Sequence, residues 1–219
     1  QQSKKKIEPF VNNLDINMDD FDRSVPFSSF NDFFARKLKP NARSIDCNPD
    51  SIVSPGDGKL LAFSNIDSSS IIRIKGLGYS LSAFLKNEEL FHKFENCSMV
   101  VLRLCPADYH RFHFPFPGKA EEAAEIKGKY YSVSPHSTRR KIKTFAQNKR
   151  QITLVKNEKI DSYIIAEIGA TLVGSILQTF TPYSNVEKGQ EKGYFKFGGS
   201  TVLLLFQKNK VLIDKDLLR

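Results

Sequence analysis

Hydrophobic positions in this chain gather mostly in short runs that are typical of β-strands. Several runs are rich in β-branched residues and are separated by turn residues such as Gly169 and Gly174. The almost continuously apolar run at 99–104 predicts a buried strand, and the segment 106–117 is irregular and aromatic. The predicted strands are 51–63 (two strands around a tight turn), 71–74, 99–104, 120–131, 151–156, 160–168, 171–179 and 201–206.

Two segments, 26–38 and 81–94, have apolar positions at helical spacing instead. Ser28 or Ser29 can cap the first helix. Its apolar positions are Phe30, Phe33, Phe34 and Leu38, and its polar edge carries Arg36, Lys37 and Lys39. An aromatic face beside basic residues suits a membrane interface. Docking of that face against the protein's own core is the alternative.

These elements predict an α+β fold, with one domain, a mainly antiparallel β core and a few peripheral helices. We expect the N-terminal helix at the membrane interface. The chain has 219 residues, of which 40% are hydrophobic and 26% charged, and this composition is globular rather than disordered. No internal repeat or low-complexity tract divides it.

The net charge of +9 favours anionic partners, either nucleic acid, acidic protein or anionic lipid. A basic protein without an anionic target is the plainer alternative. No nucleic-acid motif and no block of Lys and Arg is visible, so nucleic acid is not an expected partner.

The three cysteines have neither metal-site spacing nor the even number of a disulfide framework. No apolar run approaches the roughly 20 residues that span a bilayer. The sequence begins at Gln1, and its first methionine is Met18. We therefore expect a processing point or the edge of a longer chain, with any targeting or anchoring segment upstream.

Three short motifs carry candidate chemistry. In the first, Ser54-Pro55-Gly56-Asp57-Gly58, glycine on both sides of Asp57 allows a sharp turn and leaves the carboxylate unobstructed. An aspartate in a turn is structural far more often than it is catalytic.

The second motif, 108–115, places His110 and His113 three residues apart in an aromatic stretch. Imidazoles titrate near neutrality and can exchange protons, and histidines at this spacing can also bind a metal. A third metal ligand with matching spacing is missing. Packing in the core is the plain alternative for both histidines.

The third motif is Gly198-Gly199-Ser200, directly before the apolar run at 201–206. Such a turn usually needs no chemical explanation. However, a serine hydroxyl can attack the carbonyl of the residue before it, and glycine at that position offers little steric hindrance. Self-cleavage of the chain between Gly199 and Ser200 is therefore chemically accessible.

Together, and in this order, the three motifs resemble those of phosphatidylserine decarboxylases. The segments 30–40, 75–81, 169–176 and 188–195 are similar to that family as well, so the resemblance covers the chain from about residue 30 to 206. Each motif alone is weak, and their order and spread make the resemblance specific. The family commonly has Leu-Gly-Ser or Val-Gly-Ser at the cleavage site, whereas this chain has Gly-Gly-Ser.

The resemblance implies a self-cleaving zymogen. Asp57, His113 and Ser200 would form the triad that cuts the Gly199–Ser200 bond, giving a large subunit 1–199 and a small subunit 200–219. Ser200 would become a covalent pyruvoyl group, the cofactor. On it, phosphatidylserine would lose CO2 through a Schiff base and leave as phosphatidylethanolamine, with His110 as the proton donor.

Several further expectations follow from this resemblance. We expect Tyr79 and Phe114 to contact substrate, with Phe112, Phe114 and Phe116 lining a port for the lipid tails or packing in the core. No metal is expected. The partners would be phosphatidylserine, an anionic membrane surface and a second copy in a homodimer. The protein would be peripheral to a bacterial inner membrane, a mitochondrial inner membrane or an endomembrane.

Three alternatives stay open on the sequence. One is a decarboxylase of a related serine phospholipid. Another is a hydrolase that binds a metal through His110, His113 and Asp57. The third is a basic membrane-binding or nucleic-acid-binding domain without enzymatic activity.

Overall fold

A computed structural model describes residues 2–66, 72–74, 77–128, 148–169, 175–197 and 200–218 of the chain. Of residues 72–74 and 77–79 it describes only the backbone. The helices are η1 (Lys4–Lys6), α1 (Ile7–Asn13), α2 (Phe30–Phe34), α3 (Leu81–Leu85) and α4 (Glu88–Lys93). The strands are β1 (Lys59–Ile66), β2 (Ile72–Ile74), β3 (Leu77–Tyr79), β4 (Cys97–Leu104), β5 (Arg111–His113), β6 (Gly118–Ala120), β7 (Ala124–Ile126), β8 (Arg150–Asn157), β9 (Asp161–Gly169), β10 (Ile176–Gln178), β11 (Asn185–Val186), β12 (Glu191–Phe195) and β13 (Ser200–Phe206).

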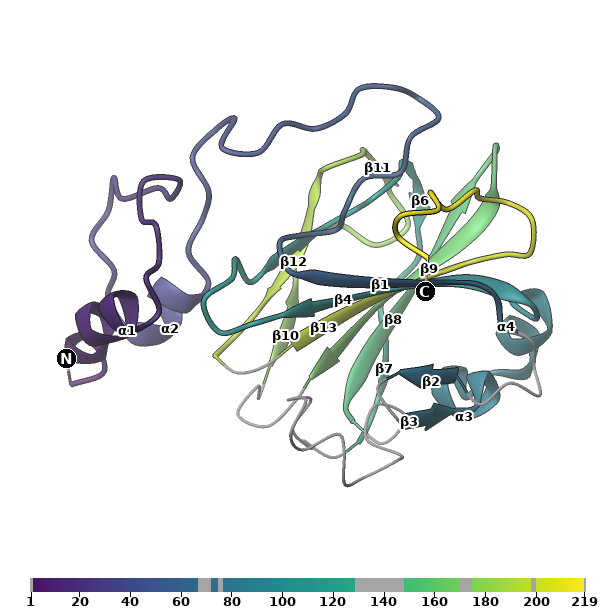
Figure 1. The fold of residues 1–219 in the computed structure, drawn as a ribbon, viewed down its shortest axis with the longest axis horizontal. Helices are drawn as coiled ribbons and strands as arrows, with labels where there is room; N and C mark the ends of the chain where they lie inside the picture. Colours follow the sequence, from purple (N-terminus) through teal and green to yellow (C-terminus); the bar gives the residue numbers. More distant parts are fainter. Residues whose placement is uncertain are drawn as a thin grey trace.

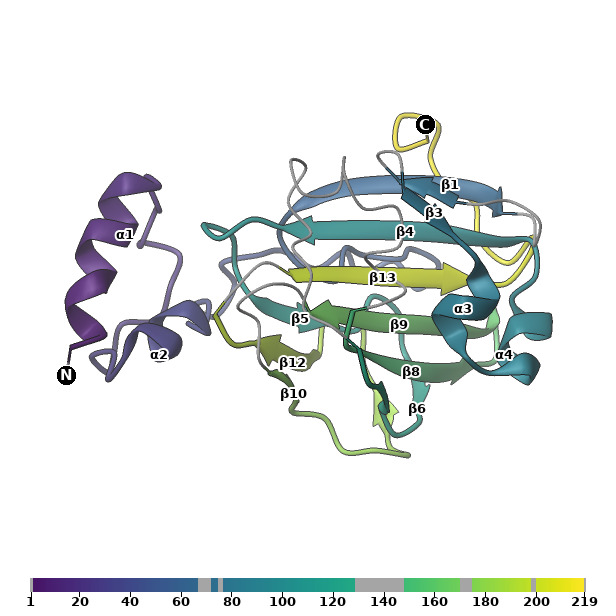
Figure 2. The ribbon, with the colours of Figure 1, turned by 90° about the horizontal axis from the view of Figure 1, so that it is seen from below.

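An eight-stranded antiparallel sheet forms the centre of the molecule (Figure 2). Its strands follow the order β1-β4-β13-β9-β8-β6-β11, and β7 also pairs with β8. The last long strand of the chain, β13, lies between β4 and β9 and pairs with both along its whole length. Smaller sheets have the orders β10-β12-β5 and β2-β3.

Apolar side chains on both faces of the large sheet build the core. Alternate residues of β13 enter opposite clusters, with Leu203 and Leu205 on one face and Val202 and Leu204 on the other. The first cluster is completed by α3 and the segment around Phe94, and the second by the three-stranded sheet. A strand buried on both faces reads as the continuous apolar run seen in the sequence.

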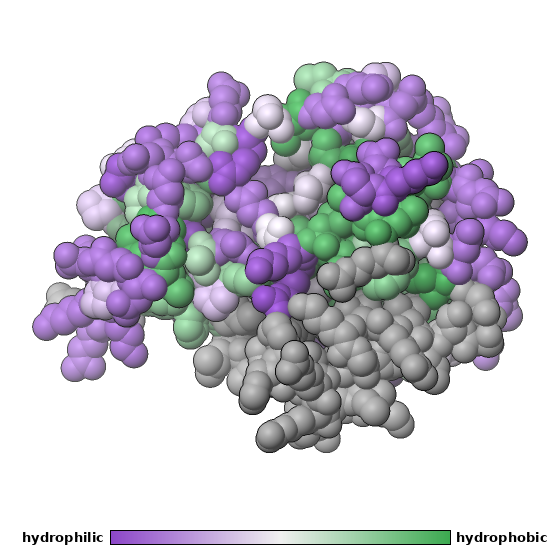
Figure 3. Space-filling model, viewed as in Figure 1, coloured by the Kyte–Doolittle hydropathy of each residue, from purple (hydrophilic) through white to green (hydrophobic). Residues whose placement is uncertain are grey.

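The N-terminal segment with α1 and α2 extends from one end of the sheets (Figures 1 and 2). On the face shown in Figure 3 this segment presents mainly hydrophilic residues. At the other end, an apolar groove of about 520 Å³ lies beside the C-terminal segment, and its lining includes Leu60, Val211, Leu212 and Leu217. Hydrophobic residues are visible on that part of the surface in Figure 3.

The α+β prediction with a mainly antiparallel core is confirmed, and the long strands lie close to their predicted positions. The strand expected before the turn in 51–63 is wrong. That stretch is irregular because Pro55 has no N–H to donate and Ser54 hydrogen-bonds Gly56. Within 106–117, expected to be irregular, β5 forms by pairing with β12.

In the segments 120–131 and 171–179 the structure differs from the single strands that were predicted. The first contains the end of β6 and all of β7, and the second contains β10. Residues 129–131 and 170–174 lie outside the part of the chain that the structure describes.

The predicted helices are shorter than expected. Ser29 caps α2 by accepting a hydrogen bond from the Asp32 amide, but the helix ends at Phe34. In the segment 81–94 the helix breaks at Lys86, whose φ of 50° is left-handed, and Asn87 caps a second helix.

Two expectations about the first helix also change. Phe33 and Phe34 are both 0% exposed, so the aromatic face packs on the protein, as in the second of the two alternatives. Arg36 does not lie on a polar edge, since it is only 1% exposed. Among the described residues, no helix is long and apolar enough to cross a membrane.

Candidate active site

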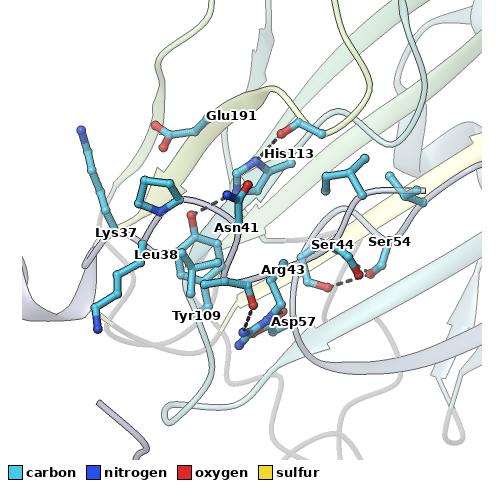
Figure 4. Close-up of a pocket in the computed structure, with 17 residues that line it drawn as sticks. Lys37, Leu38, Asn41, Arg43, Ser44, Ser54, Asp57, Tyr109, His113 and Glu191 are labelled. Atoms are coloured by element: carbon cyan, nitrogen blue, oxygen red, sulfur yellow. Dashed lines mark hydrogen bonds and ion pairs between the residues drawn. The ribbon is translucent and has the colours of Figure 1, made fainter. Parts of the chain in front are cut away.

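Two of the three motifs and the N-terminal segment meet at a pocket of about 510 Å³ (Figure 4). The loop 53–57 supplies one wall, and β5 with the residues before it supplies another. The segment 37–45 and the residues Gly189 and Glu191 complete the lining. Asp57, Tyr109 and His113 all line this pocket.

Asp57 lies in the turn before β1 and binds an arginine. The Arg43 guanidinium donates to its carboxylate from Nη2 at 2.9 Å and from Nε at 3.3 Å, and also reaches Asp20 at 2.9 Å. These hydrogen bonds raise the pKa of Arg43. The turn sits tightly on β4, because a Cβ on Gly58 would come within 2.6 Å of the Arg103 carbonyl oxygen. The turn residues therefore hold the carboxylate at the edge of the sheet.

His113 ends β5, and both of its ring nitrogens have partners. Nδ1 lies 2.8 Å from the Gly189 carbonyl oxygen, and Nε2 lies 3.1 Å from the Tyr109 hydroxyl. Because a carbonyl only accepts, Nδ1 carries the proton, and Nε2 of the neutral ring accepts from Tyr109. Burial lowers the pKa of His113, against an opposing contribution from the Gly189 carbonyl. The ring is thus a neutral proton acceptor at Nε2.

His110 is fully buried beside the pocket rather than on its lining. Its Nδ1 lies 2.8 Å from the Asp108 carbonyl oxygen, so this ring also carries its proton on Nδ1. Its Nε2 has no hydrogen-bond partner among the described residues. Burial lowers the pKa of His110 to about 3. A neutral imidazole with a buried acceptor nitrogen has to take up a proton before it can donate one.

Ser200 is the first residue of β13 and is 0% exposed. It lies opposite Leu104 of β4 and Gly169 of β9. Its hydroxyl has no hydrogen-bond partner within the described ranges. Gly199, the other residue of the predicted cleavage site, lies outside the described residues. The connection that holds this site joins β12 in the small sheet to β13 in the large one.

The structure therefore brings two of the three predicted triad residues into one pocket. Asp57 and His113 share the pocket, but no hydrogen bond joins them in the described part of the chain, and Ser200 is not on the pocket lining. The roles predicted for Asp57, His110, His113 and Ser200 in cleavage and turnover stay predictions at this point.

The predicted substrate contacts have different surroundings. Tyr79 ends β3, and its side chain is outside the described residues. Phe112, Phe114 and Phe116 are all buried in the core cluster between the two larger sheets, where Phe114 packs edge-on against Phe180. None of the three rings lines the candidate pocket, whereas Phe116 also lines the apolar groove beside the C-terminal segment. The substrate contact predicted for Phe114 stays a prediction.

Sequence reasoning did not single out Arg43, Tyr109 or Arg36 as site residues. Arg43 lies 14 residues before its partner Asp57, and Arg36 lies about 70 residues before the carbonyls that it binds. No local sequence pattern can therefore indicate these contacts. The only available signals were that Tyr109 lies within the histidine motif and that Arg36 lies within a segment similar to the decarboxylase family.

No group of three or more His, Cys, Asp or Glu side chains in the described ranges could hold a metal ion. His110 and His113 both direct Nδ1 to main-chain carbonyls, and Nε2 of His113 is also hydrogen-bonded to the Tyr109 hydroxyl.

Comparison with known proteins gives a consistent result. A family model described as phosphatidylserine decarboxylase matches residues 30–218. The phosphatidylserine decarboxylase proenzyme of Desulfitobacterium hafniense (strain Y51) is 49% identical over 216 residues, which are 98% of this chain and 72% of the relative. The proenzyme of Fusobacterium nucleatum is 48% identical over 218 residues, covering 99% and 73%. That of Clostridium tetani is 49% identical over 217 residues, covering 99% and 73%.

Proposed function

The chain belongs to the phosphatidylserine decarboxylase family, and from this we propose that it is a self-cleaving enzyme that converts phosphatidylserine to phosphatidylethanolamine and CO2. The reactive group would be a pyruvoyl group made from Ser200 when the Gly199–Ser200 bond is cut. The cleaved protein would consist of a large subunit, 1–199, and a small subunit, 200–219.

One observation carries this proposal: the hydroxyl of Ser200 is fully buried and has no hydrogen-bond partner among the described residues. A buried hydroxyl without a partner costs stability, and such groups in native proteins often have a chemical role. The surroundings also fit a pyruvoyl group. Loss of the hydroxyl breaks no hydrogen bond within the described ranges, and the facing residues, Gly169 and Leu104, present no charge.

We assign the general base of self-cleavage to His113. Its Nε2 is the acceptor nitrogen of a neutral ring, as a base requires, and Asp57 lies in the same pocket. In the structure, however, the Tyr109 hydroxyl is hydrogen-bonded to Nε2 of His113, and the Arg43 guanidinium is hydrogen-bonded to Asp57. His113 would therefore exchange the Tyr109 hydroxyl for that of Ser200 before it takes the proton, with Asp57 stabilising the imidazolium that forms.

Self-cleavage needs no external oxidant or reductant, because it consists of an acyl shift, an elimination and a hydrolysis. Ser200 Oγ attacks the carbonyl carbon of Gly199 and loses its proton to His113 Nε2. The Gly199–Ser200 C–N bond then breaks as the Ser200 nitrogen takes that proton from His113, so the amide becomes an ester with a free amine. Loss of the Ser200 α-proton then breaks the ester Oγ–Cβ bond, which releases the Gly199 carboxylate and leaves dehydroalanine at position 200. Addition of water and loss of ammonia give the pyruvoyl terminus.

In the second reaction the pyruvoyl group supplies an electron sink for the electron pair that CO2 leaves behind. Our candidate for proton transfer is His110. Its unpartnered Nε2 would first accept a proton and then return it to the α carbon of the head group.

The substrate is a membrane lipid, so we propose that the protein works at an anionic membrane surface. The net charge of +9 and the exposed Lys4–Lys6 segment support this proposal, because basic residues near a surface attract acidic lipids. The compartment and the expected homodimer stay predictions. A salt-dependent affinity for phosphatidylserine vesicles, absent with phosphatidylcholine vesicles, would support the surface assignment.

Conversion of phosphatidylserine in mixed micelles, followed by mass spectrometry of the lipids, tests the activity. We expect phosphatidylethanolamine from the wild-type protein and none from Ser200→Ala. Treatment with hydroxylamine, which reacts with ketones, should also stop the wild-type reaction. Turnover by Ser200→Ala at the wild-type rate would reject the pyruvoyl assignment. Another serine phospholipid converted in preference to phosphatidylserine would instead favour the related decarboxylase.

A further inference from the structure

Arg36 is a buried arginine that no step above uses. It follows α2 by two positions, and its side chain is almost completely enclosed. Nη2 donates to the carbonyl oxygens of Ala107 at 2.8 Å and Asp108 at 3.2 Å. The rings of Phe21 and Phe33 lie 4.2 and 4.9 Å from the guanidinium carbon. Burial lowers the pKa of Arg36 to about 10, so the group remains charged at neutral pH.

The same carbonyl oxygen, that of Asp108, is shared by Arg36 and His110. Arg36 Nη2 reaches it from the segment after α2, and His110 Nδ1 reaches it at 2.8 Å from within the loop. The ring of Phe34, two residues before Arg36, packs on the imidazole with centroids 3.8 Å apart. Phe34 and Arg36 therefore contact both the ring of His110 and the Asp108 carbonyl that fixes its tautomer.

The remaining neighbours of His110 in the described part of the chain are mostly uncharged. The Phe195 amide of β12 donates to the His110 carbonyl at 3.0 Å, and Phe197 packs on Phe34. The Asp108 carboxylate accepts from the Cys105 amide at 2.6 Å. Burial is the main cause of the low pKa of His110; the Asp108 carbonyl opposes it, and the charge of Arg36 lowers it further. Arg36 thus acts on both the orientation and the protonation of the ring.

We propose that Arg36 is a positioning residue for His110 in decarboxylation. It fixes the Asp108 carbonyl, so that His110 keeps its proton on Nδ1 and presents Nε2 as a bare acceptor. Its positive charge makes the protonated ring a stronger acid, which favours return of the proton to carbon. This inference rests on the role in turnover that is proposed above for His110.

The test compares Arg36→Met, Arg36→Lys and Arg23→Met. Arg23 lies in the same N-terminal region, but its side chain is 54% exposed and pairs with the nearby Asp19, so Arg23→Met controls for the loss of one positive charge. Each variant is purified from cells as the self-processed protein. Its degree of cleavage is read on a gel, and its kcat is measured between about pH 3 and 8 with phosphatidylserine micelles, a range that includes the pKa of about 3 of His110.

We expect Arg36→Met to be cleaved but to lose at least about 10-fold in kcat. The acidic limb of its pH profile should move to higher pH by about one unit, because removal of a nearby charge raises the pKa of His110. Arg36→Lys should keep the wild-type limb, since it keeps the charge, with an intermediate kcat. Arg23→Met should match the wild type in both readouts.

Two outcomes would overturn the inference. One is a wild-type pH profile and kcat in Arg36→Met. The other is loss of self-cleavage in that variant to the same degree as loss of turnover, which would make Arg36 a folding residue. If Arg36→Met does not fold, ¹⁵N NMR of the His110 ring in Ser200→Ala protein, with and without Arg36→Lys, decides. Protonation on Nδ1 with a bare Nε2 in Ser200→Ala, and ring resonances that shift when Arg36→Lys is added, support the inference. A ring protonated on Nε2 in Ser200→Ala, or ring resonances that Arg36→Lys leaves unchanged, contradict it.

His110→Ala in the same assay separates this inference from the proposed function. If that variant is cleaved and turns over normally, the role of His110 is wrong. If it is cleaved and inactive while Arg36→Met behaves as the wild type, only the role of Arg36 is wrong.

Discussion

At the residue scale, both histidines of the candidate site donate from Nδ1 to a main-chain carbonyl and differ in what reaches Nε2. Tyr109 hydrogen-bonds Nε2 of His113, whereas Nε2 of His110 has no partner among the described residues. The two rings are therefore prepared differently. His113 has to give up one hydrogen bond before it can act on Ser200, and His110 has a free acceptor.

Substitution Tyr109→Phe tests this distinction. Removal of the hydroxyl frees Nε2 of His113 without a change of ring volume, so self-cleavage should become about 2- to 10-fold faster, the equivalent of one hydrogen bond. The measurement is the rate at which the small subunit appears after rapid synthesis of the precursor. Slower cleavage by Tyr109→Phe would mean that the hydroxyl helps the reaction instead of competing with it.

The buried histidines also predict a pH dependence of stability. An unfolded histidine titrates near 6.5, whereas burial lowers the pKa of His110 in the folded protein to about 3. Between these values the unfolded state binds more protons. The free energy of unfolding is therefore unaffected by titration of this ring above about pH 6.5. As the pH falls from about 6.5 to about 3, it decreases by about 1.4 kcal/mol per pH unit for this one group. His113, whose pKa burial also lowers, adds to the effect.

Urea unfolding at a series of pH values would check this dependence, in the Ser200→Ala background so that one uncut chain is followed. His110→Gln should make the free energy of unfolding fall less steeply on acidification. An identical slope with and without His110→Gln would show that folding does not lower the pKa of His110.

At the element scale, an ion pair joins the small sheet to the large one. Lys192 of β12 and Glu167 of β9 are both 0% exposed, with Lys192 Nζ 2.9 Å from a carboxylate oxygen of Glu167. Gln178 hydrogen-bonds both partners. Burial raises the pKa of Glu167 and lowers that of Lys192, and their attraction opposes both shifts. The pair holds β12 on β9, just before the chain crosses to Ser200.

We expect Lys192→Met to lower the free energy of unfolding by about 3–5 kcal/mol, because it leaves a carboxylate buried without its cation. The double variant Glu167→Leu/Lys192→Met should recover most of that loss, since an apolar pair of similar volume removes the stranded charge. Denaturant unfolding of uncut Ser200→Ala protein measures both. A loss below about 1 kcal/mol in Lys192→Met would show that the two sheets do not depend on this contact.

The same scale shows how far local sequence patterns reach. The long strands β4, β8, β9 and β13 could be predicted because each is a continuous or β-branched apolar run. The end of α2 could not, because Arg36 leaves the helical path to bind carbonyls about 70 residues away. The irregular segment before Asp57 likewise follows contacts with distant chain, such as the Val53 amide with the Pro115 carbonyl.

At the scale of the whole molecule, the proposed cut comes directly before Ser200, the first residue of β13, so the small subunit would keep the central strand of the large sheet. All seven residues of β13 are buried, and the strand pairs with β4 on one side and β9 on the other. A central strand with two full ladders and two apolar faces should stay in place when one of its ends is cut.

We therefore expect the subunits 1–199 and 200–219 to elute together in native size-exclusion chromatography and to separate only under denaturing conditions. Elution of the large subunit alone, with native secondary structure, would contradict the central position of β13.

In the candidate site, too, the residues within the motifs could be predicted, but their contacts with distant parts of the chain could not. The resemblance of their motifs to the decarboxylase family placed Asp57 and His113 in one site, and they do line one pocket. The present partners of these residues, Arg43 and Tyr109, and the link between Arg36 and His110 could not be read locally. They depend on how the N-terminal segment folds back across the motifs.

The central claim is that Ser200 cuts the chain and becomes the reactive group, and intact mass spectrometry of the purified protein tests it most directly. The account predicts two chains from the wild type: 1–199, and a 200–219 peptide lighter by one ammonia than the same peptide with a free N-terminal serine. Ser200→Ala should give a single uncut chain. A wild-type protein that stays whole in the presence of anionic lipid, or a small peptide that retains its serine, would contradict the account.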